Sequence, residues 1–483
     1  MIFERVLIAL AVATTVAMLS WTLIRFLSIV AQRRGFVADV RADRWHALPT
    51  PTIGGVGIVV AFLVGFAVTR GVFDDFRDAT SANADVVIAL IIGSVGAAAV
   101  GLWDDLAHFR PSTKLAAQCA CASIFLWIAG GVSITGSATV DGVIALLFIV
   151  AVMNAVNMLD NMDGVAGTAV MIGLVGIAAL NASGGSGSFL PLIAVICAGA
   201  VAGFLGHNLP RARVFMGDAG SLFLGFILAA LLLLGLGART VEPEAALVAV
   251  LGCLFVPLID MTVVSLARVR RGESPMQGGR DHTTHRLVRL GVSERGLVWL
   301  VAAVAIVGVA GALAGTQFES PSAAASAALV VLFVLLVAVL LRMCVRMDGP
   351  AHMRAAALAP FVKVVIDVVT IAAVLNAGYM IRWEFEIPPE LENSIAWSLP
   401  VALACCVAIN ALRGEYVKSW QITGAGLRSA LASSLIGAVV AAAVIAAVWS
   451  PQRLFSRAAM GIFLVGYPTV GVLVRLVVGW VVR

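Results

Sequence analysis

The sequence predicts an all-α, polytopic integral membrane protein with about fifteen transmembrane helices. Of its 483 residues, 61% are hydrophobic and only 12% are charged, and the mean hydropathy is +1.04. A water-soluble fold could not bury this much apolar surface. Apolar windows long enough to cross about 30 Å of hydrocarbon as a helix recur from end to end. Lys and Arg residues, moreover, fall mainly on one side of these windows, as they do in membrane proteins.

The predicted helices follow one another with short connections. The first apolar run is too long, and too weakly basic at its front, for a cleaved secretory signal, so we expect it to remain as an anchor. The sixth and seventh windows are short and rich in glycine, which leaves the count open by one or two. The fifteen windows are centred near residues 16, 61, 94, 124, 148, 173, 198, 229, 256, 306, 332, 371, 404, 439 and 469.

The orientation follows from the positive charges. If the N-terminus faces outward, 25 of the 32 Lys and Arg residues lie on the inner side. Cytoplasmic loops retain positive charge, so we expect the N-terminus outside and, with an odd number of spans, the C-terminus in the cytoplasm. The net charge of +5 is then an orientation signal, and no nucleic-acid partner is expected. All seven cysteines lie in apolar spans without CxxC spacing and are interpreted as packing residues.

Two adjacent acids stand where the third span ends, in "GLWDDLAHF" (101–109). The macrodipole at the C-terminal end of a helix opposes negative charge, so Asp104 and Asp105 need another source of stabilisation. A cation, or a phosphate ligand with its metal, would supply it. The alternative is a solvated pair of acids at the membrane interface.

Two further inner segments carry polar groups. "DRWHALPTPTIGGVGI" (43–58) combines prolines that stiffen a loop with glycines that allow close backbone approach, although an ordinary entry into a helix explains it equally well. In "NAVNMLDNMDGVAG" (154–167), four polar groups recur with a spacing of three and would share a rough face of a helix. Such groups at the end of a membrane span are costly unless they bind something. The four are Asn154, Asn157, Asp160 and Asp163.

The last two inner segments suit phosphate chemistry. In "NLPRARVFMGDAGSLFLG" (208–225), Gly217 to Ser221 precede an apolar helix, forming an N-terminus suited to a phosphate, with Asp218 free to hold a hard cation. A simple N-cap is the alternative. "ARVRRGESPMQGGRDHTTHRLVRLG" (267–291) carries His282, His285 and six arginines, the side chains best shaped for phosphate oxygens. A positive-inside loop explains the arginines but not the histidine pair.

Together these segments predict an inward-facing site at membrane level with several acids, Mg²⁺, backbone donors and basic groups. Such a site suits the transfer of a phosphorylated group between a soluble nucleotide and a lipid phosphate. A transporter is the rival class, but its acids would lie near the middle of the bilayer, whereas these lie at the inner ends of spans. A scaffold without activity would not need the full set of acids.

The motifs resemble, in order, those of the polyprenyl-phosphate N-acetylhexosamine-1-phosphate transferases of the glycosyltransferase 4 type. They are "WHALPTPTIGG", "GLWDDL" followed by Lys114 and Gln118, "NAVNMLDNMDG", "VFMGDAGS" and "DHTTHRL". The resemblance covers roughly residues 1–345. It implies transfer of N-acetylhexosamine 1-phosphate, GlcNAc in the first place, from a UDP-sugar to undecaprenyl phosphate, with release of UMP. It also implies a need for Mg²⁺, with Mn²⁺ as an alternative.

The resemblance also assigns roles by position. Asp218 would be the metal ligand, and Asp104 and Asp105 would handle the lipid phosphate, with Asp104 as the base or orienting group. His282 and His285 would contact the sugar phosphates. The substrate pocket would be lined by His46, Thr50, Lys114, Asn157, Asp160, Asp163, Asn208, Arg213 and Phe215.

Three departures from the family pattern bear on the pocket. Asn161 stands where the family usually has Gly, Thr284 replaces a His, and Arg213 takes the place of a Lys. The phospho-N-acetylmuramoyl-pentapeptide transferase, the alternative within the family, commonly carries a triple histidine that this chain lacks. We therefore expect an enzyme that initiates a cell-envelope polysaccharide at the cytoplasmic face of a bacterial plasma membrane. The sequence does not fix the sugar, the pathway or the oligomeric state, and a homodimer is compatible with it.

The polar pattern changes near residue 347. We predict a phosphoglycosyltransferase core of about eleven helices over residues 1–346 and a four-helix membrane module over residues 347–483. The later stretch resembles the membrane module that precedes the catalytic domain of certain sugar-nucleotide enzymes of polysaccharide biosynthesis. No such domain follows it here, so its role stays open.

Overall fold

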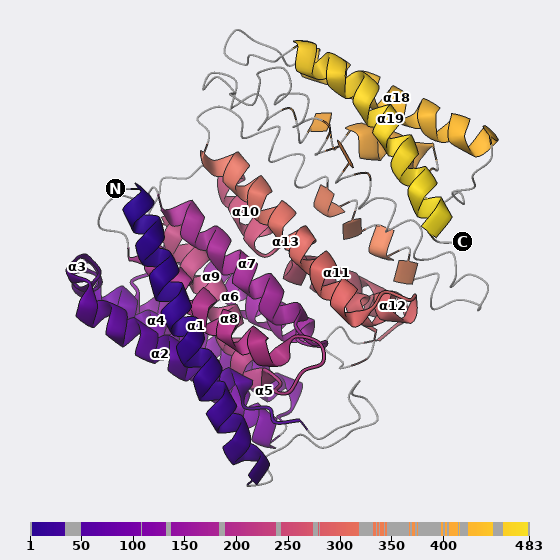
Figure 1. Ribbon diagram of the computed structural model, residues 1–483. Helices are drawn as coiled ribbons and strands as arrows, with labels where there is room; N and C mark the ends of the chain where they lie inside the picture. Colours follow the sequence, from indigo (N-terminus) through magenta and orange to yellow (C-terminus); the bar gives the residue numbers. More distant parts are fainter. Residues whose placement is uncertain are drawn as a thin grey trace. The chain divides into compact units, whose positions relative to one another are not determined.

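The computed structural model in Figure 1 describes most of the first two thirds of the chain and less of the remainder. It divides the chain into two compact units, Met1–Leu313 and Ala314–Arg483, which we treat separately. Among the described residues, the regular structure is helical throughout, apart from an isolated bridge at Thr50. The described ranges are 2–33, 50–107, 109–131, 137–182, 189–237, 243–273, 279, 281–317, scattered positions from 332 to 415, 424–447 and 457–481.

Thirteen helices begin in the described part of the first unit. They are α1 (Ile2–Arg33), α2 (Gly54–Val72), α3 (Asp74–Ala82), α4 (Ala84–Ala107), α5 (Pro111–Ile128), α6 (Ala138–Leu159), α7 (Val165–Asn181), α8 (Leu190–Asn208), α9 (Gly217–Gly237), α10 (Pro243–Cys253), α11 (Phe255–Arg270), α12 (Thr283–Arg289) and α13 (Glu294–Gln317). The second unit contains α18 (Gly424–Ala447) and α19 (Arg457–Val481), which pack on each other.

The multi-pass membrane fold is confirmed in the described residues. Eight helices are long and apolar enough to span a bilayer, and a ninth span arises if the broken pair α10 and α11, bent by 81°, is counted as one. Helices also form at the predicted windows near residues 124 and 173, as α5 and α7, but neither is among these candidate spans. The total of fifteen spans and the outward N-terminus stay predictions, because much of the chain around residues 332, 371 and 404 lies outside the described residues.

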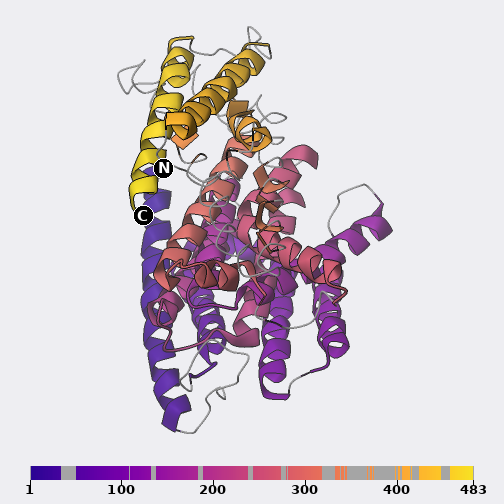
Figure 2. The ribbon, with the colours of Figure 1, turned by 90° about the vertical axis from the view of Figure 1, so that its right-hand side faces the viewer.

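The core of the first unit is built around α9. In its most apolar window, 89% of the residues are buried, compared with 22% for α1, which packs on α8 and α2 along one side of this unit (Figure 2). Small residues allow the helices to approach closely, as is usual in membranes. A Cβ atom on Gly225 would lie 2.6 Å from the Met153 Cα atom of α6, and one on Gly55 would lie 2.6 Å from the Gly220 Cα atom. The packing thus brings the first turn of α9 against neighbouring helices.

The second unit buries polar groups of its own. The amide Nδ2 of Asn410 donates to Asp367 Oδ2 at 2.8 Å and to the Tyr467 hydroxyl at 2.9 Å. All three side chains are at most 1% exposed. The compact units divide between Leu313 and Ala314. The functional boundary expected near residue 347 stays a prediction, since residues 345–366 are outside the described part of the chain.

Candidate functional site

The two adjacent acids at the end of α4 make different contacts. Asp104 Oδ1 accepts a hydrogen bond of 2.6 Å from the backbone N–H of Phe109, and its Oδ2 lies 3.0 Å from Lys114 Nζ. Asp105 turns to another helix, where its two oxygens accept from the backbone N–H groups of Asp218 and Ala219 at 3.1 and 3.2 Å. The dipole of α4 disfavours the charge of Asp105 at its C-terminal end, but the N-terminus of α9 favours this charge and so offsets the cost.

The first turn of α9 is shaped to receive the Asp105 carboxylate. Gly217 has a φ of +69°, and a Cβ atom there would lie 2.7 Å from Asp105 Oδ2, so glycine is required. We expected these N–H groups to bind a phosphate. That expectation is wrong for the N–H groups of Asp218 and Ala219, because Asp105 occupies them.

Lys114 joins the acids into one cluster. It lies in the first turn of α5, which begins with Pro111, and its side chain is 17% exposed. Its ammonium contacts Asp104, the Asp218 carboxylate and the amide oxygen of Asn157, the last at 3.2 Å. Four helices, α4, α5, α6 and α9, thus each contribute one side chain to a single polar cluster.

Asn157 bonds the oxygen of Asp218, the predicted metal ligand, that Lys114 does not contact. Its Nδ2 donates to Asp218 Oδ1 and to Ser221 Oγ, both at 2.8 Å. We expected Asp218 to be free to hold a cation, whereas in the structure its carboxylate is bonded by Lys114 and Asn157. One helical turn earlier, Asn154 pairs with Gln118 of α5 at 2.9 Å.

The four polar groups of the 154–163 segment do not share one helix face. α6 ends at Leu159, so the expectation holds for Asn154 and Asn157 but fails for Asp160, the C-cap, and Asp163, which follows in a turn. Gly164, with a φ of +74°, is the N-cap of α7, so both acids lie in the turn between α6 and α7. Asp163 Oδ2 accepts from the backbone N–H of Ala212 at 2.7 Å.

Asn208 fastens the same turn to the segment before α9. Its Oδ1 accepts from the Gly164 N–H and its Nδ2 donates to the Val214 carbonyl, both at 2.9 Å. The side chain is 4% exposed, so it braces the loops. Arg213, in contrast, is exposed, and its backbone N–H donates to the His207 carbonyl at 2.8 Å. The predicted substrate roles of Asp163, Asn208 and Arg213 stay predictions.

The segment from Thr50 to Gly55 lies against the start of α9, as the predicted site required. The Phe215 N–H donates to the Pro51 carbonyl at 2.9 Å, the Phe215 carbonyl accepts from the Gly54 N–H at 3.0 Å, and the Gly55 N–H donates to the Met216 carbonyl at 2.8 Å. Thr50 is buried, with 7% of its surface exposed. His46 lies outside the described residues.

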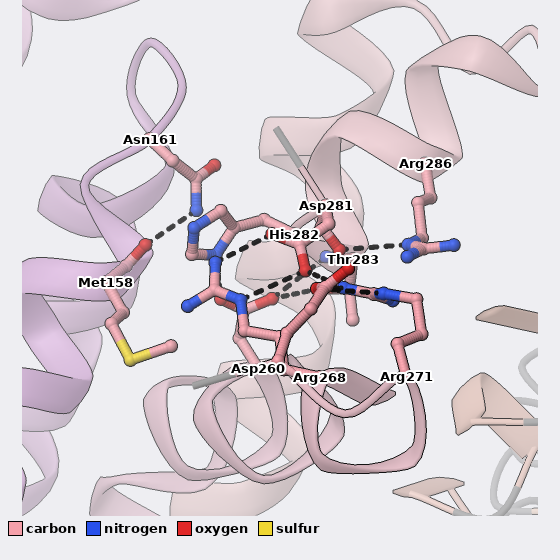
Figure 3. Close-up of polar contacts among 10 residues, drawn as sticks. Met158, Asn161, Asp260, Arg268, Arg271, Asp281, His282, Thr283 and Arg286 are labelled. Carbon is pink, nitrogen blue, oxygen red and sulfur yellow. Dashed lines mark hydrogen bonds and ion pairs between the residues drawn. The ribbon is translucent and has the colours of Figure 1, made fainter. Parts of the chain in front are cut away.

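His282 lies in a second group of residues around α12 (Figure 3), and His285 belongs to the same helix. His282 Nδ1 lies 3.0 Å from Asp260 Oδ2, and the centres of the His282 and His285 rings are 6.1 Å apart. Asp260 also accepts from the backbone N–H of Thr283 at 3.1 Å and from its hydroxyl. Asp260 is not among the site residues predicted above, although an acid inside the apolar run "FVPLIDMTVV" is itself a signal of function in a membrane.

Two of the expected phosphate-binding arginines are engaged elsewhere. Arg268 bonds both carboxylate oxygens of Asp281, at 2.7 and 3.0 Å, and Arg271 bonds Asp281 and Glu273 at 2.6 and 2.7 Å. Burial alone would raise the pKa of Asp281, but the hydrogen bonds from the two arginines outweigh it and hold this pKa well below its usual range. These arginines close the loop that precedes α12.

The 157–161 segment links the two groups of residues. At one end Asn157 contacts Asp218, and at the other Asn161 Oδ1 accepts from the Thr284 hydroxyl at 2.5 Å. Asn161 Nδ2 donates to the Met158 carbonyl at 2.7 Å, which fixes its amide (Figure 3). Asn161 and Thr284, two of the three departures from the family pattern, are therefore in direct contact.

The acids of the cluster do not by themselves form a complete set of metal ligands among the described residues. Within the described ranges, no three His, Cys, Asp or Glu side chains form a group that could hold a metal by themselves. Mg²⁺ is usually bound by one or two carboxylates together with water and substrate phosphates, so this is no obstacle to it. The cluster can thus hold cationic and phosphate groups, but not a closed structural metal site.

Comparison with known proteins gives a consistent picture. Residues 87–236 match the family described as glycosyl transferase family 4. The decaprenyl-phosphate N-acetylglucosaminephosphotransferases of Mycolicibacterium smegmatis and Mycobacterium tuberculosis are 31% and 30% identical over 327 residues, covering 60% of this chain and 78% of each relative. The undecaprenyl-phosphate alpha-N-acetylglucosaminyl 1-phosphate transferase of Escherichia coli is 33% identical over 132 residues, or 25% of this chain and 35% of that protein.

Proposed function

The chain belongs to glycosyl transferase family 4, and on this basis we propose that it transfers N-acetylglucosamine 1-phosphate from a UDP-sugar to a polyprenyl phosphate. The structural observation that carries the proposal is the convergence of Asp104, Asn157 and Asp218 on the Lys114 ammonium. Acids and a cation in one polar cluster, beside helices long enough to span a membrane, suit a reaction between two phosphates at the membrane surface.

In the proposed reaction, a phosphate oxygen of the lipid attacks the β-phosphorus of the UDP-sugar. A bond forms between this oxygen and the β-phosphorus, the bond from the β-phosphorus to the bridging oxygen breaks, and UMP leaves. The lipid phosphate is already anionic near neutral pH, so it needs orientation more than deprotonation. Holding both phosphates in one place provides much of the rate enhancement.

Each residue of the cluster has a definable task. Lys114 would neutralise phosphate charge, and Asp104, which lies 3.0 Å from it, would orient the lipid phosphate. Asp105 would act through α9, since its carboxylate fixes the backbone beside Asp218. His282 and His285, which belong to the second group of residues around α12, would contact the sugar phosphates.

The donor set fits a divalent cation. The oxygens of Asp104, Asp218 and Asn157 already converge on one positive charge, the Lys114 ammonium, and hard oxygen donors are what Mg²⁺ prefers. Asp218 would hold the ion together with substrate oxygens. When bound, Mg²⁺ would offset the charge that develops on the diphosphate.

The pathway and the location follow from the same premise. The relatives named above are bacterial, and the positive charges favour a site that faces the cytoplasm. We propose that the product initiates a cell-envelope polysaccharide at the inner leaflet of the plasma membrane. N-acetylglucosamine is the proposed sugar because it appears in the names of these relatives.

The test is UMP release and transfer of label from radioactive UDP-GlcNAc to undecaprenyl or decaprenyl phosphate, with and without Mg²⁺. We expect D218N and D104N to lower turnover by at least about 100-fold. Each substitution removes a carboxylate charge of the protein that would act on the reacting phosphates or on their metal. The matched control is D141N, which alters a buried acid at the opposite end of α6. Metal-independent transfer, or near wild-type turnover by D218N, would refute the assignment.

A further inference from the structure

Asp260 is a buried acid for which the proposed reaction provides no direct contact. It lies in α11, the second half of the broken pair, five residues after that helix begins. Its surface is 2% exposed. A carboxylate at this depth is costly unless strong donors satisfy it, so its partners indicate why it is there.

Three donors satisfy the two oxygens of Asp260, and all of them come from the start of α12. Oδ1 accepts from the backbone N–H of Thr283 at 3.1 Å and from the Thr283 hydroxyl. Oδ2 lies 3.0 Å from His282 Nδ1 (Figure 3). Because an ionised carboxylate only accepts hydrogen bonds, the proton on a neutral His282 must reside on Nδ1.

This arrangement leaves the other ring nitrogen available. Among the residues that the structure describes, none hydrogen-bonds to His282 Nε2. The beginning of α12 is held from a second side as well, since the Thr284 hydroxyl donates to Asn161 at 2.5 Å. The ring of His282 is thereby fixed between α11 and the turn that follows α6, the same turn that leads back to Asn157.

We propose that Asp260 is a positioning residue, which accepts from His282 Nδ1–H and so orients the ring and stabilises the imidazolium form that donates from Nε2 to a phosphate of the substrate. The inference rests on the proposed transferase function, in which His282 contacts those phosphates. With the carboxylate behind it, the imidazole has a fixed orientation and its positive form is stabilised when Nε2 donates to a phosphate oxygen. Thr283 keeps Asp260 in place by occupying its other oxygen.

The decisive variant is D260N. Its amide oxygen is required by the two donors of Thr283, so its NH₂ group faces His282 Nδ1 and donates to it. The ring proton must then move to Nε2, and Nδ1 must stay unprotonated to accept from the amide, so the ring cannot become the imidazolium without losing this bond, while the fold keeps its hydrogen bonds. We expect kcat for UMP release to fall by about 100-fold, with KM for UDP-GlcNAc changed much less.

A double-mutant cycle with H282Q separates positioning from a merely structural role. If Asp260 acts through His282, D260N will cost about 100-fold in the wild-type background and less than about 2-fold in the H282Q background. Equal losses in both backgrounds, or a D260N enzyme with wild-type kcat, would overturn the proposal. D141N again serves as the control for changing a buried acid, with kcat expected to be unchanged.

A second measurement does not depend on activity. In ¹⁵N-histidine NMR of the full chain, which has six histidines, the signal of His282 is identified by its loss in H282N. We expect a proton on Nδ1 in the wild type and on Nε2 in D260N. A wild-type His282 with its proton on Nε2 would overturn the proposal even if the transferase assignment were correct. If wild-type protein transfers no sugar phosphate but shows the expected tautomer, the proposed function fails and Asp260 still orients His282.

Discussion

At the scale of single residues, several kinds of donor satisfy the acids that the structure describes. Asp104 has an ammonium and one N–H, Asp105 has the N-terminus of a helix, and Asp281 has two guanidinium groups. The Asp104 and Asp218 carboxylates share the Lys114 ammonium, a cation that a substrate or metal could replace. This difference separates the acids that hold the fold from those proposed for chemistry.

Asp281 allows a prediction about pH. Its pKa in the folded state lies below the unfolded value of about 3.9, so its contribution to stability is complete above that value and is lost as the pH falls toward the folded pKa. We expect D281N to lower the free energy of unfolding by about 1–2 kcal/mol at pH 7, with the difference shrinking below about pH 4. Chemical unfolding of the solubilised protein from pH 3 to pH 8 measures it.

The control for this prediction is E273Q. Glu273 also bonds Arg271, but its side chain is exposed, so water screens the pair. E273Q is expected to change stability little at any pH. A D281N deficit that persists unchanged at pH 3 would contradict the linkage argument.

At the scale of the elements, the contact between α4 and α9 positions the metal candidate. A Cβ atom on Gly101 would lie 2.6 Å from the backbone nitrogen of Ala219, and closer still to the Asp218 carbonyl. We expect G101A to push the two helices apart, lowering the free energy of unfolding by about 1–3 kcal/mol and reducing turnover more than 10-fold. Thermal unfolding and UMP release of the purified variant test this.

Gly142 offers the matched substitution. It also lies inside a helix, α6, but a Cβ atom there would have nothing within 4 Å. We expect G142A to be neutral or slightly stabilising, because Ala favours helix over Gly. Equal effects of G101A and G142A would show that the close approach of α4 and α9 does not position Asp218.

Some elements were predictable from sequence and others were not. Apolar windows predicted the helices around residues 16, 61, 94, 148, 198, 229 and 306, because bilayer thickness sets the length of a span. A spacing of three residues could not show that α6 ends at Leu159, since that end depends on Asn208 and Ala212 bonding the following turn. Long-range contacts of this kind leave no local signal.

The same limit explains the candidate site. Polar residues at one end of several predicted spans indicated that Asp104, Asn157 and Asp218 belong to one site, and the structure shows them in contact with Lys114. The capture of Asp105 by α9 did not follow, because 113 residues separate it from Asp218. Asp260 was overlooked because it lies inside an apolar window rather than at its end, where the other polar groups gather.

At the scale of the whole molecule, every described residue of the candidate site lies in the unit Met1–Leu313. We expect a chain ending at residue 346 to retain UMP release within about twofold of the full-length protein, since the first unit carries every described residue of the candidate site. The assay compares the two chains in membranes at equal protein levels. A chain that inserts normally but loses activity would assign a catalytic contribution to residues 347–483.

The pairing of Asp105 with the start of α9 also constrains how the protein is made. A ribosome adds about 5–20 residues per second, so the 113 residues between Asp105 and Asp218 take roughly 6–20 s to appear. The donors to Asp104, the Phe109 N–H and the Lys114 ammonium, are encoded within ten residues of it, whereas the donors to Asp105 are not yet made during that interval. We therefore expect Asp104 to find its partners early in biogenesis, and Asp105 only when α9 has been synthesised.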